Sequence, residues 1–255
     1  MRKVILLAAS ALLVPGTASA EGYVAGSYQS VDSGSDSGDS VDALAGRILV
    51  TENIMLDGGF ASADGLVLSG EREDFWQVGA HVFGRGEKWL LGGYVGYNYY
   101  DLDAPFHFED WTLAGEGQYY LDRVTLGAAV IYSIGKGLNP STDFKSWTVS
   151  GDVRLFVTDN IALHGTASWG KVTEFSDDGT AFGFGVEYQF DSAPISIFAG
   201  YRTTDITDSN GKDTRGIGLR WNFGEGTLIQ RDRTGARLAR PVGMLEESLV
   251  NIQPQ

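Results

Sequence analysis

Few side chains in this sequence could perform covalent or metal chemistry. Of its 255 residues three are histidine and none is cysteine, which excludes thiolate nucleophiles, thiolate metal ligands and disulfides. His81, His107 and His164 show neither the H-E-x-x-H spacing of a zinc site nor a G-x-S-x-G nucleophile motif nearby. The sequence therefore predicts no metal site and no cofactor.

One histidine has acidic neighbours. His107 stands in the segment APFHFED, with Asp103, Glu109 and Asp110 close by in the sequence. A histidine beside a carboxylate can act as a general base toward a hydroxyl or a water. Because no nucleophile motif accompanies it, a hydrolase is the least favoured of the functions considered, and no catalytic residue is predicted.

Charged residues within alternating segments form a second chemically active group. Successive side chains of a strand face opposite sides, and these charges lie opposite the apolar face, so we expect them to face a common interior. The set is Arg47, Asp57, Glu116, Asp152, Arg154, Glu187 and Arg220. Opposed charges across a narrow lumen could orient passing solutes. Alternatively they pair and fill the interior, since an unpaired charge in dry surroundings is costly.

The clearest of these segments forms a hairpin at residues 145–169. From Trp147 to Val157 every second residue is apolar or glycine, and the intervening positions are mostly polar. The polar turn 158–160 follows, and alternation resumes from Ile161 to Trp169. Strands of about 9–11 residues with one apolar face and aromatic residues at the rim are typical of membrane-spanning barrels.

The same pattern recurs twelve times. The alternating segments are 22–30, 41–50, 54–61, 75–83, 89–100, 111–121, 124–134, 147–157, 161–169, 180–190, 195–203 and 214–223. Short connections alternate with long polar ones, and the even count lets a sheet close without an exposed edge. We therefore predict an all-β fold, a transmembrane antiparallel up-and-down β-barrel of about 12 strands with short periplasmic turns and longer extracellular loops. A secreted β-sandwich also alternates, but its connections would not sort by length in this way.

Aromatic residues gather at the ends of these segments. They predict two girdles at the membrane–water interfaces, made up of Trp76, Trp89, Trp111, Trp147, Trp169, Trp221 and Phe223.

The two ends of the chain differ from the barrel segments. Residues 1–20 combine Arg2 and Lys3, an apolar run and an Ala-Ser-Ala site, which predicts a signal peptide for export across the inner membrane. Residues 21–223 form the predicted barrel. Residues 224–255 lose the alternation and contain four arginines between positions 231 and 240. We expect a flexible periplasmic tail there, with a lumen plug or a partner contact as alternatives.

Residues 21–223 resemble Gram-negative outer-membrane β-barrels of the porin-like kind. The resemblance rests on the amphipathic segments and the aromatic girdles, together with the signal peptide that precedes them. The final strand reads GIGLRWNF. Members typically end in an aromatic residue that the barrel-assembly machinery recognises, and Phe223 matches that position although the chain continues to Gln255. The resemblance implies a bacterial outer-membrane location in contact with lipid and lipopolysaccharide.

The expected function is a porin-like channel for passive diffusion of small hydrophilic solutes or ions. A net charge of −14 argues against nucleic-acid binding, and the acidic loops suggest a mild preference for cations. The alternative is a non-transporting structural or surface-interaction barrel with a filled lumen. The sequence leaves the solute and the oligomeric state open.

Overall fold

The computed structural model describes residues 21–32, 37–64, 72–101, 107–136, 143–173, 177–207, 211–234 and 237–244. The predicted signal peptide and the end of the tail, residues 245–255, lie outside the described residues.

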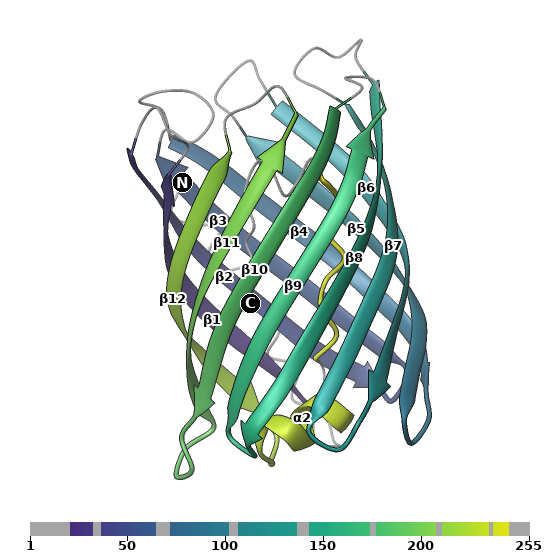
Figure 1. Ribbon diagram of the computed structural model, residues 1–255, viewed down its shortest axis with the longest axis vertical. Coiled ribbons are helices and arrows are strands. Elements are labelled where there is room, and N and C mark those ends of the chain that lie inside the picture. Colours follow the sequence, from purple (N-terminus) through teal and green to yellow (C-terminus); the bar gives the residue numbers. More distant parts are fainter. Residues whose placement is uncertain are drawn as a thin grey trace.

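Twelve strands form one closed antiparallel barrel, in which each strand pairs with the next and β1 pairs with β12 (Figure 1). The strands are β1 (Gly22–Asp32), β2 (Ser37–Thr51), β3 (Ile54–Asp64), β4 (Arg72–Arg85), β5 (Trp89–Asp101), β6 (His107–Tyr120), β7 (Val124–Lys136), β8 (Asp143–Thr158), β9 (Ile161–Val172), β10 (Asp177–Gln189), β11 (Ile195–Ile206) and β12 (Lys212–Phe223). One short helix, α2 (Leu228–Thr234), follows β12. The predicted fold class is confirmed.

The strands extend further than the alternating segments predicted, mainly away from the short turns. β8 begins at Asp143 rather than at Trp147, and β6 begins at His107 rather than at Trp111. The added residues continue the backbone ladder, for example Lys136 opposite Asp143, but their outward side chains are polar, while Phe108 and Phe144 face inward. Apolar alternation marks only the part of a strand with one apolar face, so it misses these extensions. Both tryptophans consequently lie inside their strands.

The outer face of the barrel is apolar. Leu91, Val130 and Phe184 point outward from three strands and are 62–63% exposed. Large exposed apolar surfaces are rare on soluble monomers, and a lipid bilayer would cover this one. Among the described residues no helix is long and apolar enough to cross a membrane.

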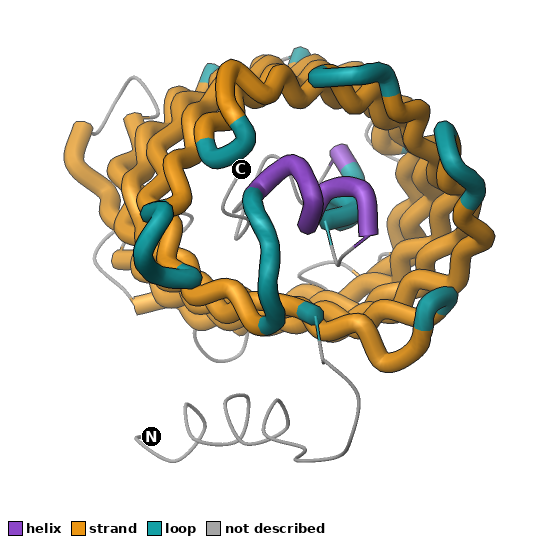
Figure 2. The backbone as a smooth tube through the Cα atoms, turned by 90° about the horizontal axis from the view of Figure 1, so that it is seen from below, coloured by secondary structure: helices purple, strands orange, loops and turns teal. Residues whose placement is uncertain are grey.

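The interior is not empty. After β12 the chain turns back, and α2 and residues 237–244 lie inside the ring of strands (Figure 2). Gly224 and Gly226 have φ values of 79° and 119°, a backbone region that only glycine adopts readily, and they make the reversal possible. We call residues 224–234 and 237–244 the lumen segment. Its position differs from the expected flexible periplasmic tail, because Arg237 pairs with Glu187 and Asp232 pairs with Arg154 on the inner wall.

Candidate functional site

The structure places all seven sequence-predicted interior charges on the inner wall. Six of them are 8% exposed or less, and the Asp152 side chain is 16% exposed. They do not form one site. Three of them, Arg47, Arg154 and Glu187, contact the lumen segment, which the sequence analysis treated separately.

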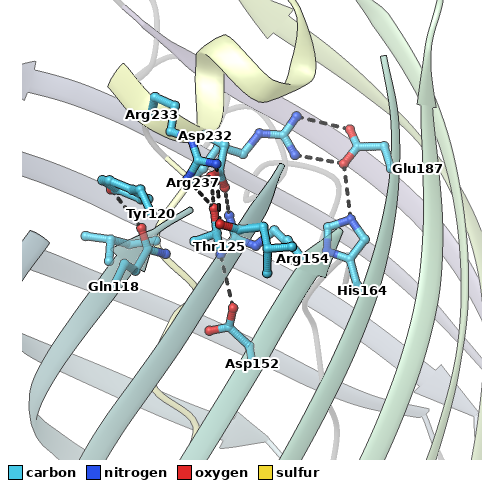
Figure 3. Close-up of polar contacts among 12 residues, drawn as sticks. Gln118, Tyr120, Thr125, Asp152, Arg154, His164, Glu187, Asp232, Arg233 and Arg237 are labelled. Atoms are coloured by element: carbon cyan, nitrogen blue, oxygen red, sulfur yellow. Dashed lines mark hydrogen bonds and ion pairs between the residues drawn. The ribbon is translucent and has the colours of Figure 1, made fainter. Parts of the chain in front are cut away.

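Glu187 on β10 joins the wall to the lumen segment. Its carboxylate accepts hydrogen bonds from Arg220 of β12 at 2.5 Å and from both terminal nitrogens of Arg237 at 2.7 and 3.2 Å. His164 Nε2 lies 4.0 Å from the same carboxylate (Figure 3). The bidentate geometry with Arg237 is the strong form of an arginine–carboxylate pair, and Glu187 is fully buried.

A second anchor lies at α2. Asp232 accepts hydrogen bonds from Arg154 of β8 and from the Thr125 hydroxyl of β7, as Figure 3 shows. Asp152 lies 3.6 Å from Arg154 on the same face of β8. Arg233 donates to Thr125 Oγ1 at 2.6 Å and lies 4.7 Å from the Tyr120 ring centre. The helix is therefore fixed to neighbouring strands by charge-assisted contacts.

Further along, the lumen segment follows the inner wall. The Leu238 carbonyl accepts a hydrogen bond from Arg47 of β2. Arg240 donates to the Tyr94 hydroxyl at 3.1 Å and to the Asn98 side-chain oxygen. The Met244 backbone N–H donates to Thr148 Oγ1 at 2.9 Å, and the Met244 side chain is fully buried. These contacts reach β2, β5 and β8, so the segment touches widely separated parts of the wall.

The sequence missed a buried histidine–carboxylate cluster. His81 Nδ1 lies 2.7 Å from Glu116 Oε1, and Nε2 lies 2.8 Å from Asp57 Oδ2. All three residues are buried, and the His81 ring packs 4.6 Å from the Tyr94 ring. Both ring nitrogens are engaged, which suits a structural crosslink between β3, β4 and β6. The sign of this cluster in the sequence was that Asp57, His81 and Glu116 all lie on the inward face of their alternating segments.

The histidine considered for hydrolysis has different surroundings. His107, the residue considered for hydrolysis, is exposed and stacks on Tyr99 at 5.8 Å. Its neighbour Glu109 accepts a hydrogen bond from the Tyr97 hydroxyl at 2.6 Å. Asp110 accepts from Asn98, while Asp103 lies outside the described residues. The acidic neighbours that the structure describes thus have other partners.

Between the lumen segment and the wall lies a cavity of about 120 Å³. Six arginines among the described residues line it, and we call it the arginine cavity: Arg47, Arg154, Arg202, Arg220, Arg237 and Arg240. Asp152 is the one carboxylate in the described lining, and hydroxyls come from Ser150, Thr166 and Ser168. Arg202, which the sequence did not single out, donates to Thr166 Oγ1 at 3.1 Å and to Ser168 Oγ at 3.4 Å.

The predicted girdle residues face outward or lie partly exposed. Trp76, Trp89, Trp111, Trp169 and Trp221 are exposed, and Trp147 and Phe223 are partly exposed. Near one rim the rings form a continuous row, with Trp76 5.4 Å from Tyr97 and Tyr97 5.1 Å from Trp111. Trp147 meets Trp169 edge-to-face at 4.6 Å. Their contact with a membrane interface stays a prediction.

Comparison with known proteins shows a similarity of fold. The structure is similar to the KdgM porin (TM-score 0.58, 10% identity, covering 79% of this chain and 99% of that chain). It is similar to the KdgM porin in complex with disordered oligogalacturonate (TM-score 0.57, 8% identity, 78% and 99%). It is also similar to the translocator domain of the autotransporter NalP from Neisseria meningitidis (TM-score 0.54, 15% identity, 87% and 94%). No family model and no curated protein matches the sequence.

The chain thus has the fold of outer-membrane β-barrels. At these identities the likeness concerns architecture, and function has to be argued from the lumen.

Proposed function

We propose that the protein is a porin-like outer-membrane channel for passive diffusion of small hydrophilic solutes or ions, restricted by its own lumen segment. The observation that carries the proposal is a closed barrel with charged side chains inside, occupied by a segment that forms no strand with the wall. Among the described residues the segment is held mainly by side-chain contacts, with one backbone hydrogen bond from the Ile229 N–H to the Asp159 carbonyl at 3.2 Å. Displacement of that segment would leave the wall intact, because the twelve strands pair with one another and not with it. The similarity in fold to a porin supports this proposal.

The proposal includes the route to the membrane. Residues 1–20 would direct export and be removed, the barrel-assembly machinery would insert the chain, and the girdles would contact outer-membrane lipid and lipopolysaccharide. No catalytic role is proposed, since both nitrogens of His81 are engaged by carboxylates and the described acidic neighbours of His107 have other partners.

A second candidate is a non-transporting structural or surface-interaction barrel. The buried pairs Glu187–Arg237 and Asp232–Arg154 favour it, because they fill the lumen with mutually satisfied charges. In that case the segment would be a permanent part of the core, and the outer loops would be the working surface.

Single-channel recording in a planar bilayer separates the two candidates. The purified chain 21–255 is compared with a chain ending at Phe223, each under a salt gradient. We expect small or infrequent steps from the longer chain and larger, frequent steps from the shorter one. Heat-modifiable mobility on a gel verifies folding of both. A folded 21–223 barrel that never conducts would refute the channel and favour the second candidate.

A further inference from the structure

The lumen segment runs through the barrel from one end to the other. It starts at the end of the short turns, where the Ile229 N–H donates to the Asp159 carbonyl at 3.2 Å. In Figure 1 the yellow trace of residues 237–244 rises from α2 toward the opposite end of the barrel. The last described residue of the segment donates its backbone N–H to Thr148, the neighbour of the girdle residue Trp147. The segment therefore spans the height between the two predicted girdles.

Strand β10 provides a measure of this rise. Close to the short-turn end of β10, Glu187 is bonded to Arg237. Eight residues away on the same strand lies Gly179, where an added Cβ would be 2.6 Å from the Met244 Sδ. Those eight residues of strand cover about 26 Å. The seven steps from Arg237 to Met244 reach about 25 Å when fully extended, and the long Arg237 side chain supplies the rest. The segment is thus nearly straight between the two contacts and does not double back there.

The residues of the segment suit an extended path close to the wall. Pro241 has no backbone N–H that needs a partner, and its fixed φ favours an extended chain. At Gly243 an added Cβ would lie 2.7 Å from Ser133 Oγ, so the backbone passes directly against β7. Leu238 and Val242 are 8% exposed or less. The part of the segment after α2 is therefore packed against the wall and extended along it.

We propose that the lumen segment carries the C-terminal part of the chain through its own barrel, so that the residues after Met244 reach the cell surface. The short turns mark the periplasmic side, and β12 ends on that side beside the turn before Ile195. A segment that begins there and ends at the other girdle crosses the outer membrane inside the protein. Irregular backbone is tolerated at membrane depth in such a place, because the barrel shields it from lipid. The barrel would then be both the export route and the anchor of its C-terminal part.

This inference goes beyond the proposed function and does not depend on conduction. In both candidates the segment occupies the lumen of the folded protein, either removably or as a permanent part of the core. The two contacts near the periplasmic end, Glu187 with Arg237 and Arg154 with Asp232, would hold the segment against a pull from the surface. A silent barrel with an exposed C-terminal part would refute only the channel.

Thiol labelling of intact cells tests the exit. The chain has no cysteine, so Gln255→Cys introduces a single thiol after the lumen segment. A polyethylene-glycol maleimide too large for the barrel should react with it in intact cells and shift its mobility on a gel. Lys136→Cys, at the exposed end of β7, is the outer control and should react to the same extent. Glu87→Cys, in the exposed short turn after β4, should react only after the outer membrane is permeabilised. If Gln255→Cys behaves like Glu87→Cys, the proposal is overturned.

Cross-linking of the refolded chain 21–255 tests the path. The thiols of Gly179→Cys and Met244→Cys would lie together, and mild oxidation should join them. Gly151→Cys with Met244→Cys is the matched control and should stay unjoined, because Gly151 lies on the exposed outer face. Thr148→Cys replaces Gly179→Cys if the latter does not fold, since the Met244 N–H contacts the Thr148 side chain.

The two measurements separate the ways in which the proposal could fail. If no cross-link forms in a folded barrel, the segment does not reach the outer girdle and the path is wrong. If the cross-link forms but Gln255→Cys is protected in intact cells, the chain turns back after Met244 and the surface exit is refuted. Cross-linking together with labelling in intact cells supports the proposal, whatever the conductance of the barrel.

Discussion

The substitution Arg237→Gln tests whether the lumen segment is a removable element. It deletes two charge-assisted hydrogen bonds, at 2.7 and 3.2 Å, between the segment and Glu187. Glu187 keeps its 2.5 Å contact with Arg220, so no unpaired charge remains in the wall. The substitution therefore weakens the docking of the segment without damaging the barrel.

The size of the effect follows from these contacts. Hydrogen bonds to charged groups contribute about 1.5–3 kcal/mol each, and the longer of the two is the weaker, so we expect a loss of about 3 kcal/mol. At 1.4 kcal/mol for each factor of ten, the displaced population should rise about 150-fold.

Thiol labelling measures this population. The chain has no cysteine, so Val242→Cys introduces a unique thiol at a buried position of the lumen segment. A polyethylene-glycol maleimide is too large for the closed lumen, and its reaction rate reports how often the segment leaves. Arg237→Gln in this background should react about 150-fold faster. Arg237→Lys, which keeps the charge but not the forked geometry, should fall between the two.

The same measurement has a built-in control. Lys136→Gln removes an exposed side chain, 3.9 Å from Glu109 at the end of β7 away from α2, and should leave the labelling rate unchanged. If Arg237→Gln reacts no faster than the parent, the Glu187 contact does not hold the segment and the reasoning fails.

Three further predictions concern the outer face, the wall and the α2 anchor. Val130→Arg places a charge on the outward face and should lower barrel stability in lipid by about 2–4 kcal/mol; a change within about 0.5 kcal/mol on denaturant unfolding would indicate a water-facing surface. His81→Leu leaves two buried carboxylates without their shared hydrogen-bond partner and should lower the free energy of unfolding by about 3–5 kcal/mol. His164→Leu, measured in the same way, should have a smaller effect. Asp232→Asn weakens the α2 anchor and should speed maleimide labelling of Val242→Cys, whereas unaltered labelling would show that Arg154 does not hold the helix.

Most of the fold was predictable because each strand carries its own period-two pattern. The hairpin of β8 and β9 illustrates this: Leu155 faces Leu163 across the ladder on the outer side, as the alternation from the turn requires. The pair Asp152 and Arg154 was also accessible, since residues two apart share a face of a strand. Local patterns of this kind fix strands, turns and which residues point inward.

The contacts of the lumen segment were not predictable in the same way. Arg237 meets Glu187 from 50 residues away, and Arg240 meets Tyr94 from 146 residues away. No periodicity links such residues, and four arginines after the last strand suit a solvated tail equally well. The His81 cluster was not predicted for a related reason. A long connection joins β3 and β4, so no tight turn in the sequence indicates which residues of the two strands lie opposite each other.

The reach of the lumen segment has a consequence for the order of folding. Its partners lie on strands from β2 to β10, and the Arg47–Leu238 contact spans 191 residues. Contacts between residues so far apart in the sequence form only after other interactions have brought those residues close together. They therefore form late and slowly in folding. We therefore expect the twelve strands to join before the segment docks, so that every molecule passes through a stage with an open, water-filled interior. The unplugged barrel would then be an intermediate on the folding pathway as well as an opened form of the finished protein.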